Sequence, residues 1–281
     1  MTLTAGALGE LEPEFAALGG TVSIWYGPLA GPPRYTRLPD AVHYPASTMK
    51  LAVLAAAYRL ADAGRLDLDA TVKVHNDFAS AGPGGTRFAM DPEYDSDPEV
   101  WARLGQSASL RWLLRRMVVV SSNLATNLAL ERTGCPAATD AWRAAGATTS
   151  LVRRGIEDYA ARDAGVDNLV TAADLAALLR AVATDRIASP QACAEMRDIL
   201  LAQEKNDDLP SGLPAGTPVA HKNGWVDDIR HDAAIVYPPD APPYLLVVCL
   251  STPSPDEAMR RLMARIAAAS WVGRHRIDSP S

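Results

Sequence analysis

The sequence predicts an α/β (α+β) fold in which an antiparallel sheet with flanking helices is built from both ends of the chain and an all-helical lobe is inserted between them. Strand-like segments lie near both termini, and the middle of the chain is rich in alanine and leucine at helical spacing. Because sequential antiparallel strands usually pair, the two ends are expected to meet in one sheet. We expect residues 1–46 and 204–281 to form the α/β lobe, residues 47–203 to form the helical lobe, and the active site to lie in the cleft between them.

The first 46 residues contain one helix-like segment and two strand-like segments. Residues 8–18 are expected to form the first helix. The stretch "TVSIWY", residues 21–26, combines β-branched and aromatic residues and is followed by the punctuation "GPLAGPP", which predicts a strand and a turn. The stretch "RYTRLPD" is expected to add a second, short strand.

Helical periodicity dominates the middle of the chain. The expected helices cover residues 47–63, 109–132, 137–145, 171–184 and 190–203. Two of them carry start signals. Thr171, followed by Asp174, resembles a capping box with Asp in place of Glu, and Ser189 precedes a proline at the first helical position.

One stretch within the expected helical lobe, residues 75–105, is irregular and rich in Gly, Pro and acids. Its clustered carboxylates raise the question of calcium binding; they are Asp91, Glu93, Asp95, Asp97 and Glu99. The stretch lacks the glycine and the terminal glutamate of a calcium loop. We therefore expect a solvated surface loop.

After Gly216 the pattern returns to strands. The stretches "TPVAHKNGW", "HDAAIVYPP" and "PYLLVVCLST" are separated by turns, and "SPDEAMRRLMARIAAASWV" closes the chain as an amphipathic helix with proline and acids in its first turn.

Composition and charge exclude several classes of function. With 48% hydrophobic residues and a net charge of -6 spread without long single-sign blocks, the chain has no electrostatic footprint for nucleic acid or an anionic membrane surface. The first 20 residues lack the features of an export signal, and no apolar run approaches the roughly 20 residues of a membrane-spanning helix. We expect a cytoplasmic protein with a small-molecule substrate, and the oligomeric state is left open.

Cysteine and lysine usage narrows the chemistry further. The cysteines, Cys135, Cys193 and Cys249, are widely separated without CxxC spacing, so we expect reduced, mostly buried thiols. No metal or cofactor is implied. Of 27 basic residues only four are lysines, and two of these lie in the motifs described next.

The first motif is Ser47-x-x-Lys50, at the start of the expected helix 47–63. A cation in the first turn of a helix is disfavoured by the helix dipole, yet an almost wholly apolar run follows Lys50. Residues three apart lie within side-chain reach, and a lysine whose pKa is lowered can take the proton of a serine. The alternative is a capping serine beside a surface amine.

The second motif is Ser121-x-Asn123, which follows an apolar run and precedes a helical pattern. In a catalytic interpretation Ser121 relays a proton to a leaving group and the Asn123 amide binds a substrate carbonyl. The alternative is that Ser121 or Ser122 caps the helix.

The third motif is Lys222-x-Gly224, on an expected edge strand. There Lys222 can hold a substrate carboxylate, and Gly224 lets the backbone approach closely. The alternative is a hairpin turn at Asn223-Gly224.

The order and spacing of the three motifs decide between these interpretations. Ser-x-x-Lys, then Ser-x-Asn some 70 residues on, then Lys-x-Gly about 100 residues further, is the motif set of penicillin-binding proteins and class A β-lactamases. The chain resembles the class A β-lactamase-like serine hydrolases from about residue 8 to residue 272. The segments "SSNLATN" and "RGIEDYAARDAGVDNLVTAADLA" are similar to a cytosolic, β-lactamase-related branch.

The resemblance implies a class A β-lactamase-like fold and a role for each matched residue. Ser47 would be the acylated nucleophile and Lys50 its proton acceptor. Ser121 would be the proton relay, and Asn123 would be the substrate-orienting amide.

On the expected edge strand, the resemblance implies that Lys222 is the cation on the carboxylate side of the substrate. The backbone amides of Ser47 and of Trp225, the residue after Lys-x-Gly, would form the oxyanion hole, in which each donor contributes roughly 3 kcal/mol to the transition state.

The chain also departs from the family's pattern. Ser122 stands where the middle residue is usually aspartate, and Asn223 stands where threonine or serine usually contacts the carboxylate of the ligand. The loop 152–170 lacks the Glu-x-x-x-Asn pattern that holds the deacylating water, and Glu157 is the nearest candidate for that role. The alternative for Glu157 is a surface carboxylate paired with Arg153 or Arg154.

We therefore expect a β-lactamase-like serine hydrolase that forms an acyl-enzyme at Ser47 from a small amide, lactam or ester, with weak or no turnover of β-lactams. Two alternatives stay open. An acyltransferase would pass the acyl group to an amine or alcohol, and a penicillin-binding-like sensor would keep the cleft without catalysis. No Gly-x-Ser-x-Gly elbow accompanies His221 or His231, which disfavours a Ser-His-Asp hydrolase.

Overall fold

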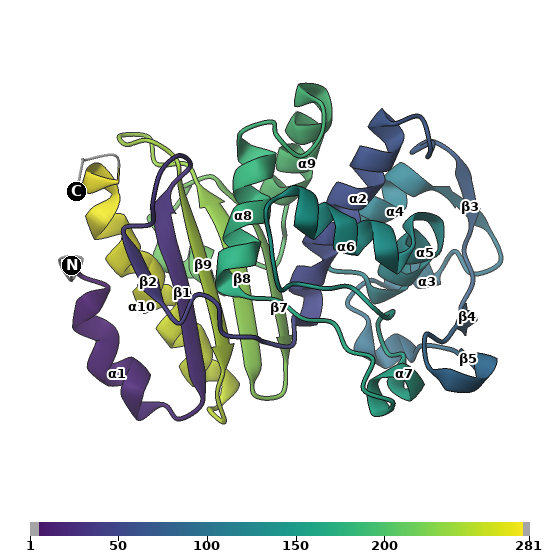
Figure 1. The fold of residues 1–281 in the computed structure, drawn as a ribbon, viewed down its shortest axis with the longest axis horizontal. Helices are drawn as coiled ribbons and strands as arrows, with labels where there is room; N and C mark the ends of the chain where they lie inside the picture. Colours follow the sequence, from purple (N-terminus) through teal and green to yellow (C-terminus); the bar gives the residue numbers. More distant parts are fainter. Residues whose placement is uncertain (1–5, 278–281) are drawn as a thin grey trace.

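A five-stranded antiparallel sheet forms one side of the molecule, and helices cover both of its faces (Figure 1). The computed structural model describes residues 6–277. The strand order is β2-β1-β9-β8-β7. The strands are β1 (Thr21–Pro28), β2 (Tyr35–Arg37), β7 (Val219–Val226), β8 (Ile229–Val236) and β9 (Tyr244–Ser251). Because β1 pairs with β9, the two ends of the chain meet in one sheet, and the expected fold class is confirmed.

The central strand β9 is apolar on both sides because both faces of the sheet are covered. Leu246 and Val248 belong to the core shared with α1 (Glu12–Ala17) and α10 (Asp256–Gly273). Val247 belongs to the larger core shared with the helical part of the chain. The sheet is thus held between two cores, and its outer layer is formed by α1 and α10 (Figure 1).

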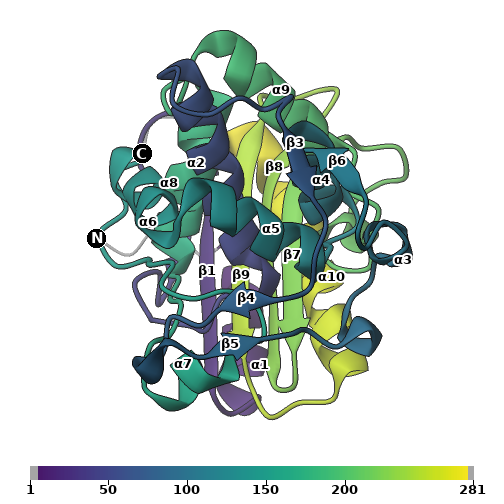
Figure 2. The same ribbon diagram turned by 90° about the vertical axis from the view of Figure 1, so that its right-hand side faces the viewer.

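The chain between β2 and β7 is mainly helical and lies in front of the sheet when the molecule is turned (Figure 2). Its helices are α2 (Lys50–Asp62), α3 (Pro98–Trp101), α4 (Leu110–Val119), α5 (Asn123–Thr133), α6 (Cys135–Ala144), α7 (Tyr159–Asp163), α8 (Ala172–Ala183) and α9 (Pro190–Leu201). Short strands form two small ladders, β3 (Thr71–Lys73) with β6 (Ser107–Ser109) and β4 (Phe78–Ala79) with β5 (Arg87–Phe88). Both α8 and α9 pack directly on the sheet. The lobe boundaries expected from the sequence stay a prediction.

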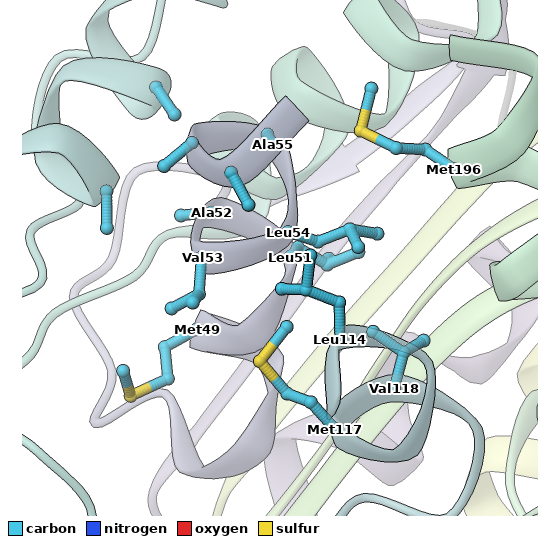
Figure 3. Packing of buried hydrophobic residues seen from close by; sticks show 14 of the residues in the cluster. Met49, Leu51, Ala52, Val53, Leu54, Ala55, Leu114, Met117, Val118 and Met196 are labelled. Carbon is cyan, nitrogen blue, oxygen red and sulfur yellow. The ribbon is translucent and has the colours of Figure 1, made fainter. Parts of the chain in front are cut away.

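Helix α2 runs through the middle of the helical part. Every residue from Lys50 to Tyr58 is buried, as expected for a helix that is apolar all round. Leu51 and Leu54 point towards Leu114 of α4, and Val53 lies on the opposite side of the helix (Figure 3). Neighbours on several sides therefore fix both the axis and the rotation of α2, and with them the start of the helix.

The helix expected over residues 109–132 is wrong in one respect, because the structure divides it into α4 and α5. Ser121, between the two helices, has a φ of 65°, a left-handed conformation that interrupts the helix. Ser122 then caps α5, since its Oγ accepts from the amide of Ala125 at 3.2 Å. Because of this break, Ser121 and Asn123 lie at the start of α5 and not in the middle of one long helix.

The hairpin turn considered at Asn223-Gly224 is also wrong. Asn223 pairs with Asp232 and Gly224 with His231, both inside the β7–β8 ladder. The chain reverses at residues 227–228 instead, where Asp228 has a φ of 61°.

The helix starts expected at Thr171 and Ser189 are confirmed, and the cysteines form no disulfide among the described residues. Thr171 Oγ1 accepts from the amide of Asp174, and Ser189 Oγ accepts from the amide of Ala192. The three cysteines are free, with Cys193 and Cys249 buried and Cys135 partly so. The stretch 75–105 contains the strands β4 and β5, two single 3-10 turns and the short helix α3, joined by loops. In the part of the chain that the structure describes, no helix has the length and apolar character needed to cross a bilayer.

Candidate active site

Ser47 lies in a single 3-10 turn, η2 (Ala46–Met49), that leads into α2. The amide of Lys50 donates to the carbonyl of Ser47, so the two residues are one 3-10 repeat apart. Residues at positions i and i+3 of a 3-10 turn lie on the same side of the turn, so Lys50 and Ser47 leave it on a common face. Ala46, just before the serine, has a φ of 46°, a strained conformation of the kind that collects at functional sites. Ser47 does not cap α2 through its side chain.

The amino group of Lys50 is completely buried and is held by α5 and the residues before it. Nζ donates to the carbonyl of Ser121 at 2.7 Å, to Oγ of Ser121 at 3.2 Å and to Oδ1 of Asn123 at 2.8 Å. Among the described residues, these are the hydrogen bonds of Nζ, and Ser47 is its neighbour along the turn. Burial lowers the pKa of Lys50 to about 7, against an opposing effect of the carboxylate of Asp95.

The loop 94–96 fixes the second motif from outside. Asn123 Nδ2 donates to the carbonyl of Tyr94 at 2.9 Å, and its backbone amide donates to Asp95 Oδ1 at 3.0 Å. Ser96 Oγ donates to the carbonyl of Val120 at 2.8 Å, just before Ser121. The Asn123 side chain is thus held on both sides, by Lys50 at its oxygen and by this loop at its nitrogen.

Strand β7 passes close to the serine at Gly224. A Cβ at this position would lie 2.5 Å from the backbone nitrogen of Ser47 and 3.0 Å from that of Thr48. Real side chains do not tolerate such distances, so the close approach requires glycine here. Because β7 is an edge strand, half of its amides face away from β8 and are available to other partners.

A cavity of about 340 Å³ opens between these elements. Of the residues expected at the site, Ser47, Ser121, Asn123 and Trp225 line it. The remaining wall is formed by the loop before α3, with Glu93, Tyr94, Asp95 and Ser96. The structure therefore brings Ser47, the second motif and the residue after the third motif around one cavity. Lys50 is buried and hydrogen-bonded to Ser121 and Asn123, and Gly224 lies against the backbone of Ser47.

Lys222 and Asn223 do not line this cavity. Lys222 is completely buried, and its Nζ donates to the carbonyl of Asn223 at 2.7 Å. Burial, together with the positive charge of Lys50, lowers the pKa of Lys222 well below its usual value. The Asn223 side chain is turned into a separate buried network, in which its Nδ2 donates to Asp208 Oδ2 at 2.7 Å.

Glu157 does not pair with an arginine, so that alternative from the sequence is wrong. Arg154 forms its ion pair with Asp167, at 2.8 Å, and Glu157 Oε2 accepts from the amide of Asp91 at 2.9 Å. Glu157 Oε1 is buried and has no hydrogen-bond partner among the described residues. Burial raises the pKa of Glu157. The residue has a φ of 62° and does not line the cavity.

Three polar residues of the site were not recognised from the sequence. Asn127 brackets Ile156, because its Nδ2 donates to the carbonyl and its Oδ1 accepts from the amide of that residue. Asp158 is buried and accepts from Ser80 Oγ at 2.6 Å, so it anchors the loop. Asp95 was counted only among the acids of an irregular stretch. One sequence signal could have pointed to Asp95: Ser122 stands where the family usually has an aspartate, so another residue has to supply that carboxylate.

Within residues 6–277, no group of three or more His, Cys, Asp or Glu side chains is placed to bind a metal ion. His221, which precedes Lys222, is buried and paired with Asp232 at 2.9 Å.

Solved structures share this fold over almost the whole chain. A β-lactamase from Sphaerobacter thermophilus DSM 20745 is 22% identical, covers 99% of this chain and 98% of its own, and has a TM-score of 0.81. An ancestral (GNCA) class A β-lactamase is 24% identical, with 95% and 98% covered and a TM-score of 0.79. A mutant of PBP-A in an acyl-enzyme complex with penicillin G is 21% identical, with 95% of each chain covered and a TM-score of 0.77.

The fold is therefore that of the class A β-lactamases, shared with PBP-A. No curated protein sequence matches the chain. Residues 8–272 match the model of the beta-lactamase enzyme family, and the chain belongs to that family.

Proposed function

We propose that this family member is an active-site serine hydrolase that forms an acyl-enzyme at Ser47 with a small amide, lactam or ester. The observation that carries the proposal is the buried amine of Lys50, one 3-10 repeat from a serine at the edge of a cavity, with a pKa lowered to about 7. A base of that pKa is half neutral at physiological pH, which suits it to accept a proton from a hydroxyl.

The proposed acylation uses the residues around the cavity. Neutral Lys50 takes the proton of Ser47 as Oγ attacks the carbonyl carbon of the substrate. The oxyanion that forms is stabilised by the backbone amides of Ser47 and Trp225. The close approach of β7 to Ser47 at Gly224 supports this pairing of the two amides. Ser121, which accepts a hydrogen bond from Lys50 Nζ, then gives its hydroxyl proton to the leaving nitrogen or oxygen and takes the proton held by Lys50 in exchange, so that Lys50 is neutral again. The bond to the leaving group breaks, and the acyl group stays on Ser47.

Release of the acyl group is the slow step in this proposal. The Glu157 carboxylate does not line the cavity, and Oε2 is already engaged by the amide of Asp91. The same observation favours acyl transfer as the second candidate, because a small amine or alcohol could enter the cavity and accept the acyl group where no carboxylate activates water.

The known complex of PBP-A supports the acylation half of the proposal. A mutant of that protein is described as an acyl-enzyme complex with penicillin G. We extend to this chain only the ability to be acylated by a reactive carbonyl compound, and the natural acyl group stays open.

Intact-mass spectrometry tests the proposal directly. The wild type and Ser47→Ala are mixed with a fluorescent penicillin, a fluorophosphonate and a panel of activated esters. We expect one adduct per chain in the wild type and none in Ser47→Ala. The absence of an adduct with every probe would overturn the assignment of Ser47 as the nucleophile and would favour a binding protein.

Time courses separate the two candidate functions. An adduct that disappears in buffer alone indicates hydrolysis. An adduct that persists in buffer but is released as an amide or ester when a small amine or alcohol is added indicates acyl transfer.

A further inference from the structure

Asp95 makes more contacts with the start of α5 than any role as a surface acid requires. Its Oδ1 accepts from the amide of Asn123 at 3.0 Å, and its Oδ2 accepts from the amide of Leu124 at 2.8 Å. Oδ2 also lies 3.3 Å from the hydroxyl of Ser122. A helix begins with amides that have no partner inside the helix, and a carboxylate is the strongest acceptor for them. Asp95 therefore caps α5 from a different segment of the chain.

The carboxylate is itself held in place. Trp101 Nε1 donates to Oδ2 at 2.9 Å, and the amide of Asp97 donates to Oδ1 at 3.1 Å. With these bonds the two oxygens of Asp95 accept from five donors. An amide at this position has a single acceptor oxygen and would turn an NH2 group towards other donors. The geometry thus demands a carboxylate and not merely a polar side chain.

We propose that Asp95 is a positioning residue for the acylation step, which sets the place of Asn123 and supplies the compensating negative charge for Lys50, at a site where Ser122 provides no carboxylate. The inference rests on the proposed function at Ser47. Asp95 touches neither the reacting serine nor its acyl group in this role, and acts through the residues it holds.

The charge argument follows from what faces the buried amine. Among the described residues, the charged group that acts on Lys50 is Asp95, from the segment before α3, whereas the positive charge of Lys50 itself acts on Lys222 of β7. Asp95 raises the pKa of Lys50 and so opposes the effect of burial. Glu157, from the segment before α7, is engaged with the amide of Asp91. Loss of the Asp95 charge leaves burial unopposed at Lys50, so we expect its pKa to fall.

The position of Ser122 makes a rescue experiment available. Because its hydroxyl lies 3.3 Å from Asp95 Oδ2, an aspartate placed there would carry its carboxylate into almost the same space. The variants are Asp95→Asn, Ser122→Asp, and the double variant Asp95→Asn/Ser122→Asp. The double variant moves the carboxylate from the loop to the helix, while the single variant Ser122→Asp crowds two carboxylates together.

The first readout is the rate constant of acylation by an activated ester between pH 5 and 9. In Asp95→Asn we expect the plateau rate to drop by about tenfold or more, because a small displacement of positioned groups is enough to lower rates strongly. We also expect the acid limb of the profile to move to lower pH by about half a unit or more. The double variant should regain most of the rate and return the acid limb towards its original place.

The matched control is Asp97→Asn, two residues along the same loop. Asp97 is buried and paired with Arg116, so this variant should lose stability without moving the acid limb. A slower Asp95→Asn with an unmoved acid limb and no rescue in the double variant would mean that Asp95 only folds the loop, and would overturn the inference.

A second readout does not depend on acylation. The sequence has only four lysines, so the pKa of Lys50 can be followed by NMR of 13C-labelled lysine side chains in each variant, with Lys50→Met for assignment. A lower pKa of Lys50 in Asp95→Asn, restored in the double variant, supports the inference. An unchanged pKa overturns it. If the wild type is not acylated by any probe, the proposed function fails, and this titration still decides the role of Asp95.

Discussion

The backbone of Gly224 lies so close to Ser47 that a Cβ on the glycine would be 2.5 Å from the amide nitrogen of the serine. An edge strand and the turn that begins a buried helix therefore meet at their backbones, with no side chain between them. The contact brings η2, which precedes the helical part of the chain, and β7, which follows it, together at Ser47.

Gly224→Ala tests this contact. The methyl group meets backbone atoms, which cannot rotate away, so β7 and η2 must separate. We expect a loss of about 1–3 kcal/mol in the free energy of unfolding, measured by urea denaturation, together with a strong decrease in the acylation rate. Gly6→Ala is the control, since no atom of the described residues 6–277 lies within 4 Å of a Cβ there. Equal stability of the two variants would contradict the close approach.

The acylation rate should depend on pH through Lys50. Because burial lowers the pKa of Lys50 to about 7, the amine is mostly protonated below that pH and cannot accept a proton. We expect the rate constant for acylation to fall about tenfold per unit below pH 7 and to level off above it. Stopped-flow measurements with an activated ester give this profile.

Lys50→Arg separates the titration of Lys50 from its positive charge. A guanidinium stays protonated at every accessible pH, so this variant should show no acylation plateau up to pH 9. Wild-type acylation that is flat from pH 5.5 to 8 would argue against Lys50 as the base.

Two buried histidines should make the fold sensitive to acid. His43 hydrogen-bonds to Ser251 and Ser23, and His231 donates through Nε2 to the carbonyl of Tyr44. Burial lowers the pKa of each to about 4. An unfolded histidine takes up a proton near pH 6.5, whereas the folded one does so only near pH 4, so stability is lost as pH falls between these values.

The loss should amount to about 3 kcal/mol per histidine by pH 4 if the full difference in pKa is realised. Urea denaturation at pH 7 and pH 4.5 measures it. His43→Gln and His231→Gln should each flatten the dependence on pH, which separates the histidines from the carboxylates that also titrate in this range. The same slope in the wild type and both variants would disprove the assignment.

Glu157→Gln tests the release of the acyl group. Since the Glu157 carboxylate does not line the cavity, we expect the rate of acylation and the lifetime of the adduct at Ser47 to change by less than about twofold. Time-resolved intact-mass spectrometry measures both. A much longer adduct lifetime in the variant would identify Glu157 as the base that activates water.

Much of this molecule is determined by local sequence. Alternating and apolar runs predicted β1 and β7 to β9, and the signals at Thr171 and Ser189 predicted helix starts, because capping and periodicity involve residues close together in the chain. The order of the three motifs predicted the family and the fold. The burial of Lys50 was not determined in this way, because the local sequence left a surface amine open.

Only the tertiary structure decided how these residues meet. It divided residues 109–132 at Ser121, decided for a continuous strand β7 against a hairpin turn at Asn223-Gly224, and turned Asn223 away from the cavity. It also determined that Asp95, one of five acids in an irregular stretch, accepts hydrogen bonds from the first amides of α5. Such choices depend on hydrogen bonds between segments far apart in the chain, whose energies no local pattern contains, whereas the sequence alone determined which chemistry Ser47 and Lys50 could perform.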